Sequence, residues 1–335
     1  MIKRCIGLII SLAGVMLATS CVDPSAAGGG KESNVQAPAT EELHGRGHGH
    51  GHGHPTKPGV PYSTRDPRVL AIREKKVREI YENLVYPTPI AILRGDKPVD
   101  DIFEKESVKG RVNPLGQFPD FSAVVEYFYA LAVSPGSRVD AVKFRSVIAG
   151  DDRVAVAVDI FFCRAPYTDC DPNKPVAGNA QTLTQIGFYQ FNRQNRVISM
   201  DLNILNLGAA SDPPNTPEAH AEAISQVCTA LTVAHVDPLT GGVVLGGTCT
   251  DFFDSEDDFA TGFPLTAVPF QNCVAFMSSI PYGTWDRGNS NTVTCRQLHT
   301  LLTAVDPDMH CPHTSADGGG ACIDFTYGSY YDDQF

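Results

Sequence analysis

The sequence predicts an α+β fold in which helices pack against a curved antiparallel sheet, followed by a small disulfide-rich domain. Apolar residues recur at helical spacing in 67–84 and 121–133, and strand-like runs then follow one another. Beyond residue 217 the composition changes, because six of the ten cysteines lie there. The predicted strands are 139–149, 152–165, 182–192 and 196–207.

The first predicted helix carries start and stop signals at both ends. Asp66 is a good N-cap, and Pro67 suits the first helical position. Apolar side chains recur from Val69 to Leu84, and Pro87 cannot continue the helix. The second helix, 121–133, is apolar on nearly all sides, which indicates that it is buried.

The strands are long, rich in β-branched and aromatic residues, and separated by tight turns. They contain the runs VAVAVDIFF, IGFYQFN and RVISMDLNILNL. Together with the buried helix before them, these runs resemble the NTF2-like, or SnoaL-like, family over residues 66–208. The resemblance implies an NTF2-like cone. That family includes isomerases, dehydratases, cyclases and domains that only bind a ligand or partner.

The N-terminus predicts an exported protein. Lys3 and Arg4 precede an apolar run of residues 6–17, which is typical of a signal peptide in 1–20. The residues before Cys21 resemble a bacterial lipobox, in which that cysteine is lipidated. The small residues 18–20 also suit an ordinary signal peptidase, so both a cell-envelope lipoprotein and a secreted protein fit. No other apolar run is long enough for a transmembrane helix, so a membrane would be reached only through the lipid anchor.

Composition divides the remaining chain into four parts. Residues 21–65 are a Gly- and His-rich tether, 66–208 the NTF2-like domain, 209–217 a linker, and 218–335 an acidic disulfide-rich domain. From Thr216 onward there are 15 acidic residues, two arginines and no lysine. That charge argues against a nucleic-acid partner.

The cysteine count supports disulfides in an oxidising compartment. If Cys21 carries lipid and Cys5 leaves with the signal peptide, eight cysteines remain, enough for four bonds. Cys163 and Cys170 are predicted to pair locally. The pairing of the other six stays open; they are Cys228, Cys249, Cys273, Cys295, Cys311 and Cys322.

The cone suggests one catalytic candidate. Asp159 shares a strand face with small and apolar residues, where desolvation would raise the pKa of a general base. Tyr127 could supply a hydrogen-bond donor, as in related isomerases. Alternatively, Asp159 faces solvent or pairs with Arg145 or Arg164. No histidine lies between His54 and His220, so a His–Asp dyad within this domain is excluded.

Histidines supply two candidate metal sites, for which Zn or Cu is the expected ion. In the tether, His48, His50, His52 and His54 alternate with glycine, although a simple low-complexity spacer fits equally. In the C-terminal domain the candidates are His299, His310 and His313, of which His299 lies on a predicted helix and the others at a Pro-His turn. These three match no standard zinc spacing. Alternatively, they hydrogen-bond backbone carbonyls within a disulfide knot.

Three functions therefore remain open. The favoured one is an exported binding or interaction protein whose cone holds a small apolar ligand or forms a homodimer face. The first alternative is an isomerase- or lyase-type enzyme centred on Asp159. The second is a metal-binding protein that uses the histidines of the tether and the C-terminal domain.

Overall fold

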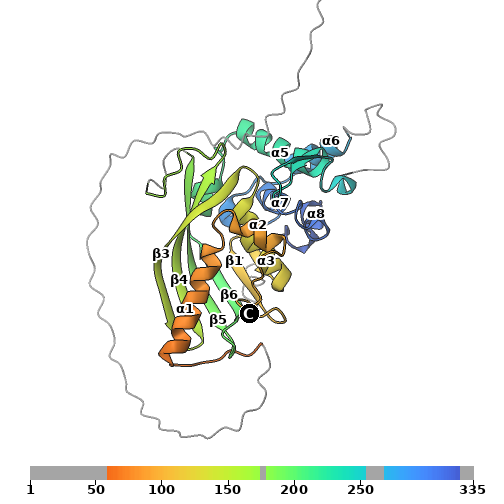
Figure 1. Cartoon of the computed structure of the whole chain (residues 1–335). Helices are drawn as coiled ribbons and strands as arrows, with labels where there is room; N and C mark the ends of the chain where they lie inside the picture. Colours follow the sequence, from red (N-terminus) through yellow and green to blue (C-terminus); the bar gives the residue numbers. More distant parts are fainter. Residues whose placement is uncertain (1–58, 174–178, 254–267, 325–335) are drawn as a thin grey trace, which may run out of the picture.

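A computed structural model of the chain describes residues 59–173, 179–253 and 268–324 (Figure 1). Within these ranges the α+β fold is confirmed. Cys21 and the histidines of the tether lie outside the described residues, as do the signal peptide and most of the tether.

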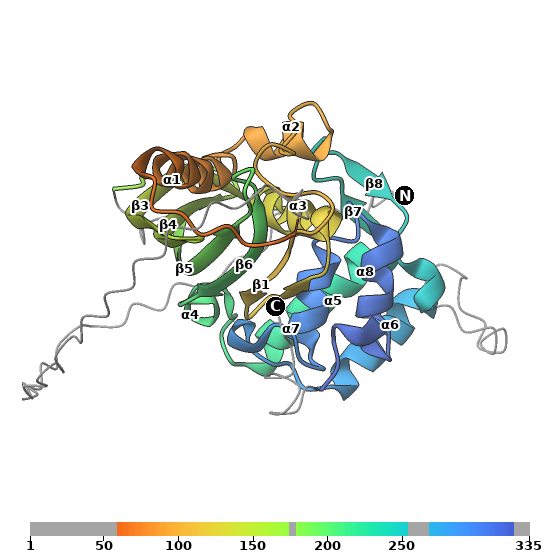
Figure 2. The same cartoon turned by 90° about the horizontal axis from the view of Figure 1, so that it is seen from below.

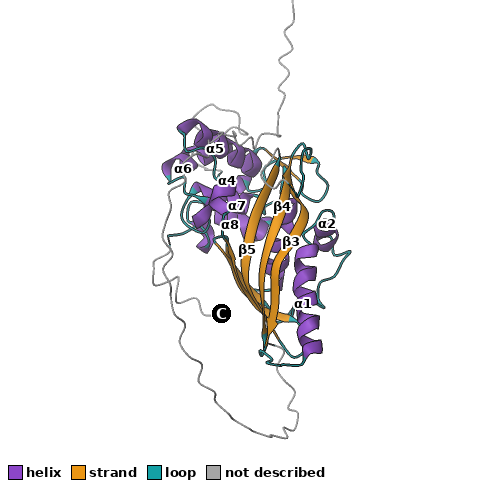
Figure 3. Ribbon diagram, turned by 90° about the vertical axis from the view of Figure 1, so that its left-hand side faces the viewer, coloured by secondary structure: helices purple, strands orange, loops and turns teal. Residues whose placement is uncertain are grey.

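A six-stranded curved sheet forms the centre of the first domain, with strand order β2-β1-β6-β5-β4-β3 (Figure 3). All neighbours are antiparallel except β1 and β6, which run parallel. The strands are β1 (Lys109–Asn113), β2 (Gly116–Phe118), β3 (Ser137–Gly150), β4 (Arg153–Arg164), β5 (Ala180–Phe191) and β6 (Val197–Ile204). The four predicted strands are β3 to β6, and their predicted ends differ by a few residues.

Helices cover one face of this sheet. They are α1 (Pro67–Glu82), α2 (Thr88–Leu93) and α3 (Phe121–Ala130), the last continued by a 3₁₀ turn, Leu131–Val133. Asp66 caps α1 by accepting a hydrogen bond from Arg68 N, as predicted. Tyr81 of α1 then packs edge-on against Phe144 and Tyr189 of the sheet.

Strand alternation fixes which residues of β4 face the helices. Val154, Val156, Val158 and Ile160 belong to the core under α1 and α3. Asp159, between two of them, therefore points to the opposite face of the sheet.

The C-terminal domain is mainly helical (Figure 2). After the short α4 (Leu207–Ser211) it contains α5 (Pro217–Thr232), α6 (Val268–Ser279), α7 (Val293–Thr300) and α8 (Pro307–Thr314), with a small hairpin of β7 (Ala234–Val236) and β8 (Val243–Leu245). The expected Pro-His turn at 310–313 is wrong. Asp306 caps a helix there, Pro307 takes its first position, and Pro312 lies inside it.

Four disulfides are present in the described residues. Cys163 pairs with Cys170, as predicted. The remaining pairs, which the sequence left open, are Cys228–Cys273, Cys249–Cys311 and Cys295–Cys322. They crosslink α5 with α6, the segment after β8 with α8, and α7 with the end of the described chain.

The core of the cone continues into the C-terminal domain. Leu298 and Leu302, in and just after α7, and Trp285 pack into the same cluster as the cone's strands. A second, smaller cluster lies among α5, α6 and the disulfides. Across the described ranges, no helix is both long and apolar enough to cross a membrane.

Arg73 joins α1 to two turns of the sheet. Its side chain is fully buried, and burial lowers its pKa. Its guanidinium donates hydrogen bonds to backbone carbonyls of Asp151, in the β3–β4 turn, and of Asn192, at the β5–β6 turn. It also donates to the carbonyl of Tyr62 and the side chain of Asn195.

We expect Arg73→Leu to lower the free energy of unfolding by about 3 kcal/mol, because buried carbonyls would lose their donors. Chemical denaturation measures the change. Arg65→Leu is the control, since the Arg65 side chain is 93% exposed and makes one ion pair with Asp151. Equal losses in the two variants would contradict the proposed role of Arg73.

Candidate functional site: an apolar cavity beside three histidines

A cavity of about 250 Å³ lies between the cone and the C-terminal domain. Most of its wall is apolar and comes from the strands and from α3. The C-terminal domain contributes Trp285, Leu298 and Leu301 to its wall. The apolar residues contributed by the cone include Val112, Leu115, Phe118, Phe128, Ile160, Leu183 and Ile204.

Gln185 is a polar group of the cavity wall whose orientation is fixed. Tyr189 donates a hydrogen bond of 3.1 Å to Tyr81, and Tyr81 donates one of 2.7 Å to Oε1 of Gln185. Burial raises the pKa of both tyrosines, so each stays a neutral donor. Because Oε1 is the acceptor, the amide nitrogen of Gln185 remains as the donor in this part of the wall.

Gln297 of α7 brings a second amide to the cavity wall. Its Oε1 is buried, and no described residue donates a hydrogen bond to it. Such an atom has lost its water without gaining a protein partner, which is costly unless a ligand or water supplies the donor. At another part of the wall, Arg164 and Gln181 hydrogen-bond each other and share the carbonyl of Ala210.

Tyr127 links the cavity to the histidines. Its ring lines the cavity, and its hydroxyl lies 3.2 Å from Nδ1 of His299. Burial, with a smaller effect from Glu126, raises the pKa of Tyr127, which keeps the hydroxyl protonated. The expected polar role of Tyr127 in the cone is therefore compatible with its position.

The three C-terminal histidines converge. Nδ1 of His299 lies 3.0 Å from Nδ1 of His310 and 3.2 Å from Nδ1 of His313. Each residue offers a nitrogen, and these nitrogens all lie within 4.8 Å of one another. His299 and His310 are buried, whereas His313 is partly exposed. The alternative in which these imidazoles bond only backbone carbonyls does not describe this arrangement.

Helix caps position these rings, and a carboxylate lies beside one of them. Thr292 caps α7, and Asp306 caps α8, each through its side-chain oxygen. From α3, Oε1 of Glu126 lies 2.9 Å from Nε2 of His310, and both groups are buried. Glu126 thus comes from the cone and His310 from the C-terminal domain.

The imidazoles of His299 and His313 are held in their neutral form. Burial, reinforced by the other histidines, places the pKa of His299 well below its ordinary value. Burial and His310 together lower the pKa of His313 to about 4. Neutral imidazole is the form that binds a metal ion.

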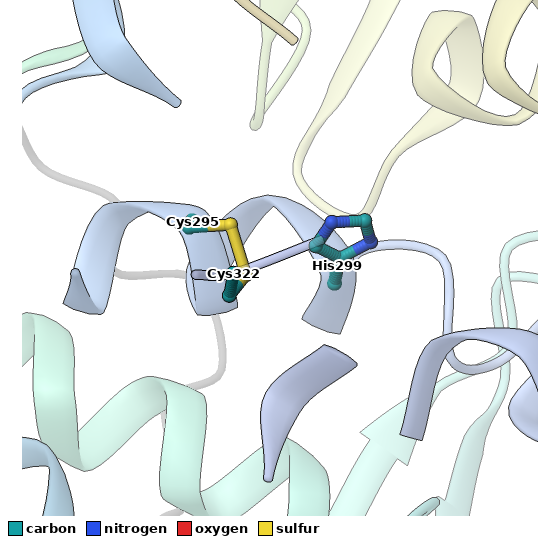
Figure 4. A group of neighbouring side chains, drawn as sticks. All are labelled: Cys295, His299 and Cys322. Carbon is teal, nitrogen blue, oxygen red and sulfur yellow. A yellow bond between two sulfur atoms is a disulfide. The ribbon is translucent and has the colours of Figure 1, made fainter. Parts of the chain in front are cut away.

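Two cysteine sulfurs lie close to His299 but are not thiolates. Figure 4 shows Cys295 bonded to Cys322 beside the His299 ring, and the S–S distance is 2.03 Å. These sulfurs are therefore unavailable as zinc-binding thiolates. The disulfide instead anchors α7 one turn before His299.

Asp159 is not inside the cone, so its expected placement is wrong. Its carboxylate accepts hydrogen bonds from Arg145 at 2.9 Å and from Thr184 at 2.8 Å, on the face opposite the cavity. The alternation of β4 explains this position, because Val158 and Ile160 occupy the inner face. The ion pair with Arg145 was one of the alternatives considered from sequence.

The sequence excludes a catalytic histidine within residues 66–208, because that range contains none. A histidine from outside the range nevertheless reaches the cone. His299 comes from the other domain and contacts Tyr127. Leu298 and Leu302 lie one turn apart and give the helix an apolar face beside His299. Such a face packs against an apolar surface, so the sequence offered a signal that His299 lies close to another part of the core. Gln185, Gln297 and Trp285 were not predicted either.

Comparison with known proteins gives one family match, at the C-terminus. Residues 269–325 match the BfoA family C-terminal domain. The chain is also similar to the Aurasperone B biosynthesis cluster protein A of Aspergillus niger, with 23% identity over 252 residues, covering 73% of this chain and 74% of that protein. The Bifonsecin B biosynthesis cluster protein A of Aspergillus brasiliensis is 22% identical, with 73% and 76% covered.

Solved structures that resemble the chain include a putative SnoaL-like polyketide cyclase and an NTF2-like protein from Burkholderia pseudomallei K96243. A putative SnoaL-like polyketide cyclase from Jannaschia sp. CCS1 has a TM-score of 0.32 and 14% identity, with 45% of this chain and 99% of that one covered. An LEH-like epoxide hydrolase of M. tuberculosis has a TM-score of 0.30 and 8% identity, with 41% of this chain and 84% of that one covered.

Removing the Cys295–Cys322 disulfide should lower the free energy of unfolding by about 3–4 kcal/mol, because this bond closes a loop of 27 residues. The variant is Cys295→Ser with Cys322→Ser, measured by chemical denaturation. The control is Cys163→Ser with Cys170→Ser, which opens a loop of only seven residues, far from the histidines, so a smaller loss is expected. If the control loses more free energy of unfolding, loop length does not determine how much these disulfides stabilise the fold.

Proposed function

We propose that this protein binds a small, mostly apolar molecule that carries hydroxyl or carbonyl oxygens. The observation that supports this most directly is the apolar cavity with Oε1 of Gln297 buried in its wall and unpaired among the described residues. A ligand hydroxyl would donate to that oxygen once the Gln297 amide rotates toward the cavity, because the oxygen is fully buried. A ligand carbonyl would accept from the amide of Gln185. A volume of about 250 Å³ favours a compact ligand, because most ligand pockets span roughly 300–1,000 Å³.

The relatives favour a role in small-molecule biosynthesis. Two of them are named as biosynthesis cluster proteins for aurasperone B and bifonsecin B. An NTF2-like fold with such relatives suits a cyclase- or isomerase-like role. The ligand of this chain would then be an intermediate or product of similar chemistry.

Catalysis is the second candidate function, and the position of Tyr127 favours it. Tyr127 lines the cavity and its hydroxyl lies 3.2 Å from Nδ1 of His299, so a ligand group that reaches this hydroxyl would exchange a proton with the imidazole through it. Tyr127 takes the place that the sequence suggested for Asp159. Ligand binding is required in either case.

The four disulfides favour an oxidising, extracellular environment, which supports a role outside the cytoplasm. We propose that residues 1–20 direct export and that lipid on Cys21 anchors the protein at a membrane. A homodimer through the outer face of the sheet also remains a prediction, since Ile186 and Phe188 are exposed there.

Gln297→Leu should weaken ligand binding about tenfold without lowering the thermal unfolding midpoint. It removes a buried, unpaired oxygen, and a lost hydrogen bond is worth about 1–1.5 kcal/mol. Trp285, the chain's only tryptophan, lines the cavity and reports binding through its fluorescence. The probe is 4-hydroxyacetophenone, which places one hydroxyl and one carbonyl on an apolar ring, and calorimetry gives the affinity.

Gln190→Leu is the matched control, because Gln190 lies on β5 beside Tyr189 but bonds Asp152 and Ser199 on the other face. Its affinity should equal that of the wild type. Saturating probe that leaves the Trp285 fluorescence unchanged, with no heat of binding, would refute the proposed cavity ligand class. Unchanged affinity in Gln297→Leu would refute the role of that oxygen.

A further inference from the structure

We propose that His299, His310 and His313 bind one divalent first-row transition-metal ion, Zn²⁺ or Cu²⁺, through their Nδ1 atoms. The site lies at the junction of α3, α7 and α8, beside the cavity but not in its wall. Imidazole nitrogen is a preferred ligand for both ions.

The surroundings of one nitrogen carry this inference. Nδ1 of His299 has three polar neighbours at 3.0–3.2 Å, namely the Nδ1 atoms of His310 and His313 and the hydroxyl of Tyr127. A neutral imidazole nitrogen is either one donor or one acceptor, so it can satisfy only one of them. A metal ion between the nitrogens satisfies all three imidazoles, because each contributes one lone pair to it.

The spacing agrees with a shared ion. Two nitrogens bound to one tetrahedral zinc at about 2.0–2.1 Å lie about 3.3–3.4 Å apart. The two Nδ1–Nδ1 distances of 3.0 and 3.2 Å are slightly shorter, so a small outward movement of the rings admits the ion.

Glu126 selects the tautomer that such a site needs. Its Oε1 lies 2.9 Å from Nε2 of His310 without hydrogen-bond geometry, so a small rotation of either side chain would let Nε2 donate its proton to the carboxylate. The lone pair of His310 is then on Nδ1, which faces His299. A carboxylate behind a metal-binding histidine is a recurring feature of metal sites, and its negative charge partly offsets that of the ion.

Tyr127 can occupy the fourth position, either directly or through a water molecule. Its hydroxyl approaches the same side of His299 as the other two imidazoles. His313 is partly exposed, so an ion can enter from its side, whereas His299 and His310 are enclosed. Because Tyr127 also lines the cavity, a bound ion would lie one side chain away from a ligand.

Metal analysis of the purified full chain tests the proposal. His44, His48, His50, His52 and His54 of the tether are replaced by Gln in every sample, and no metal-affinity tag is used. After loading with Zn²⁺ and dialysis, elemental analysis should find about one ion per chain. His313→Gln and His299→Gln should each bind Zn²⁺ at least 100-fold more weakly. Less than a tenth of an ion per loaded chain would overturn the proposal.

His235→Gln is the matched control, because His235 is partly exposed like His313 and its Nδ1 lies 3.1 Å from the carbonyl oxygen of Gly246 instead of another imidazole. It should retain the ion. Full occupancy in both His299→Gln and His313→Gln would place the ion elsewhere and overturn the proposed site. Melting temperatures of all variants identify any loss that comes from misfolding.

Two further measurements do not require a variant that lacks one of the three histidines. Co²⁺ added to the intact site should give the intense visible bands of four-coordinate cobalt, whereas only weak bands of a six-coordinate ion would refute the geometry. Glu126→Gln should weaken Zn²⁺ binding about 10–100-fold, the usual effect of losing such a carboxylate. These assays contain no organic ligand, so they can succeed or fail independently of the Trp285 titration.

Discussion

The packing of α7 against the open side of the cone is the interaction on which the site depends. Leu298 and Leu302 are buried in the same core as the strands, and Trp285 joins them. Fully burying two leucines contributes about 3–6 kcal/mol. Without this contact the cavity would lose one wall, and His299 would not reach Tyr127.

In the C-terminal domain, disulfides supply stability that a larger hydrophobic core would otherwise provide. Its own apolar cluster is small, and small domains bury too little surface to be stable alone. Cys249–Cys311 holds α8 immediately after His310, and Cys295–Cys322 holds α7 one turn before His299. The bonds therefore stabilise the fold and restrict the positions of two of the three imidazoles.

The sequence predicted the helices and strands well, but it did not predict which residues make contacts between the two domains. Asp66, Pro67 and the alternation of β4 are local signals, and the structure follows them. The sequence did not show which face of β4 points into the core. One face carries valines and the other carries Ala155, Ala157 and Asp159, and alanine and valine are both apolar. The pair Tyr127 and His299 is 172 residues apart, and periodicity says nothing about contacts at that distance.

A purely structural role for the three histidines would be an inefficient use of buried volume. Apolar side chains at these positions would pack without desolvation cost, whereas the buried pair His310 and Glu126 must be removed from water. Crowding two imidazoles and a phenol around Nδ1 of His299 leaves hydrogen-bonding capacity unmet. The low pKa of His299 means that protonation does not relieve this crowding at neutral pH. An ion that accepts all three lone pairs would satisfy these nitrogens. The carboxylate of Glu126 would then offset part of the charge of the ion, which compensates for the free energy of burying it.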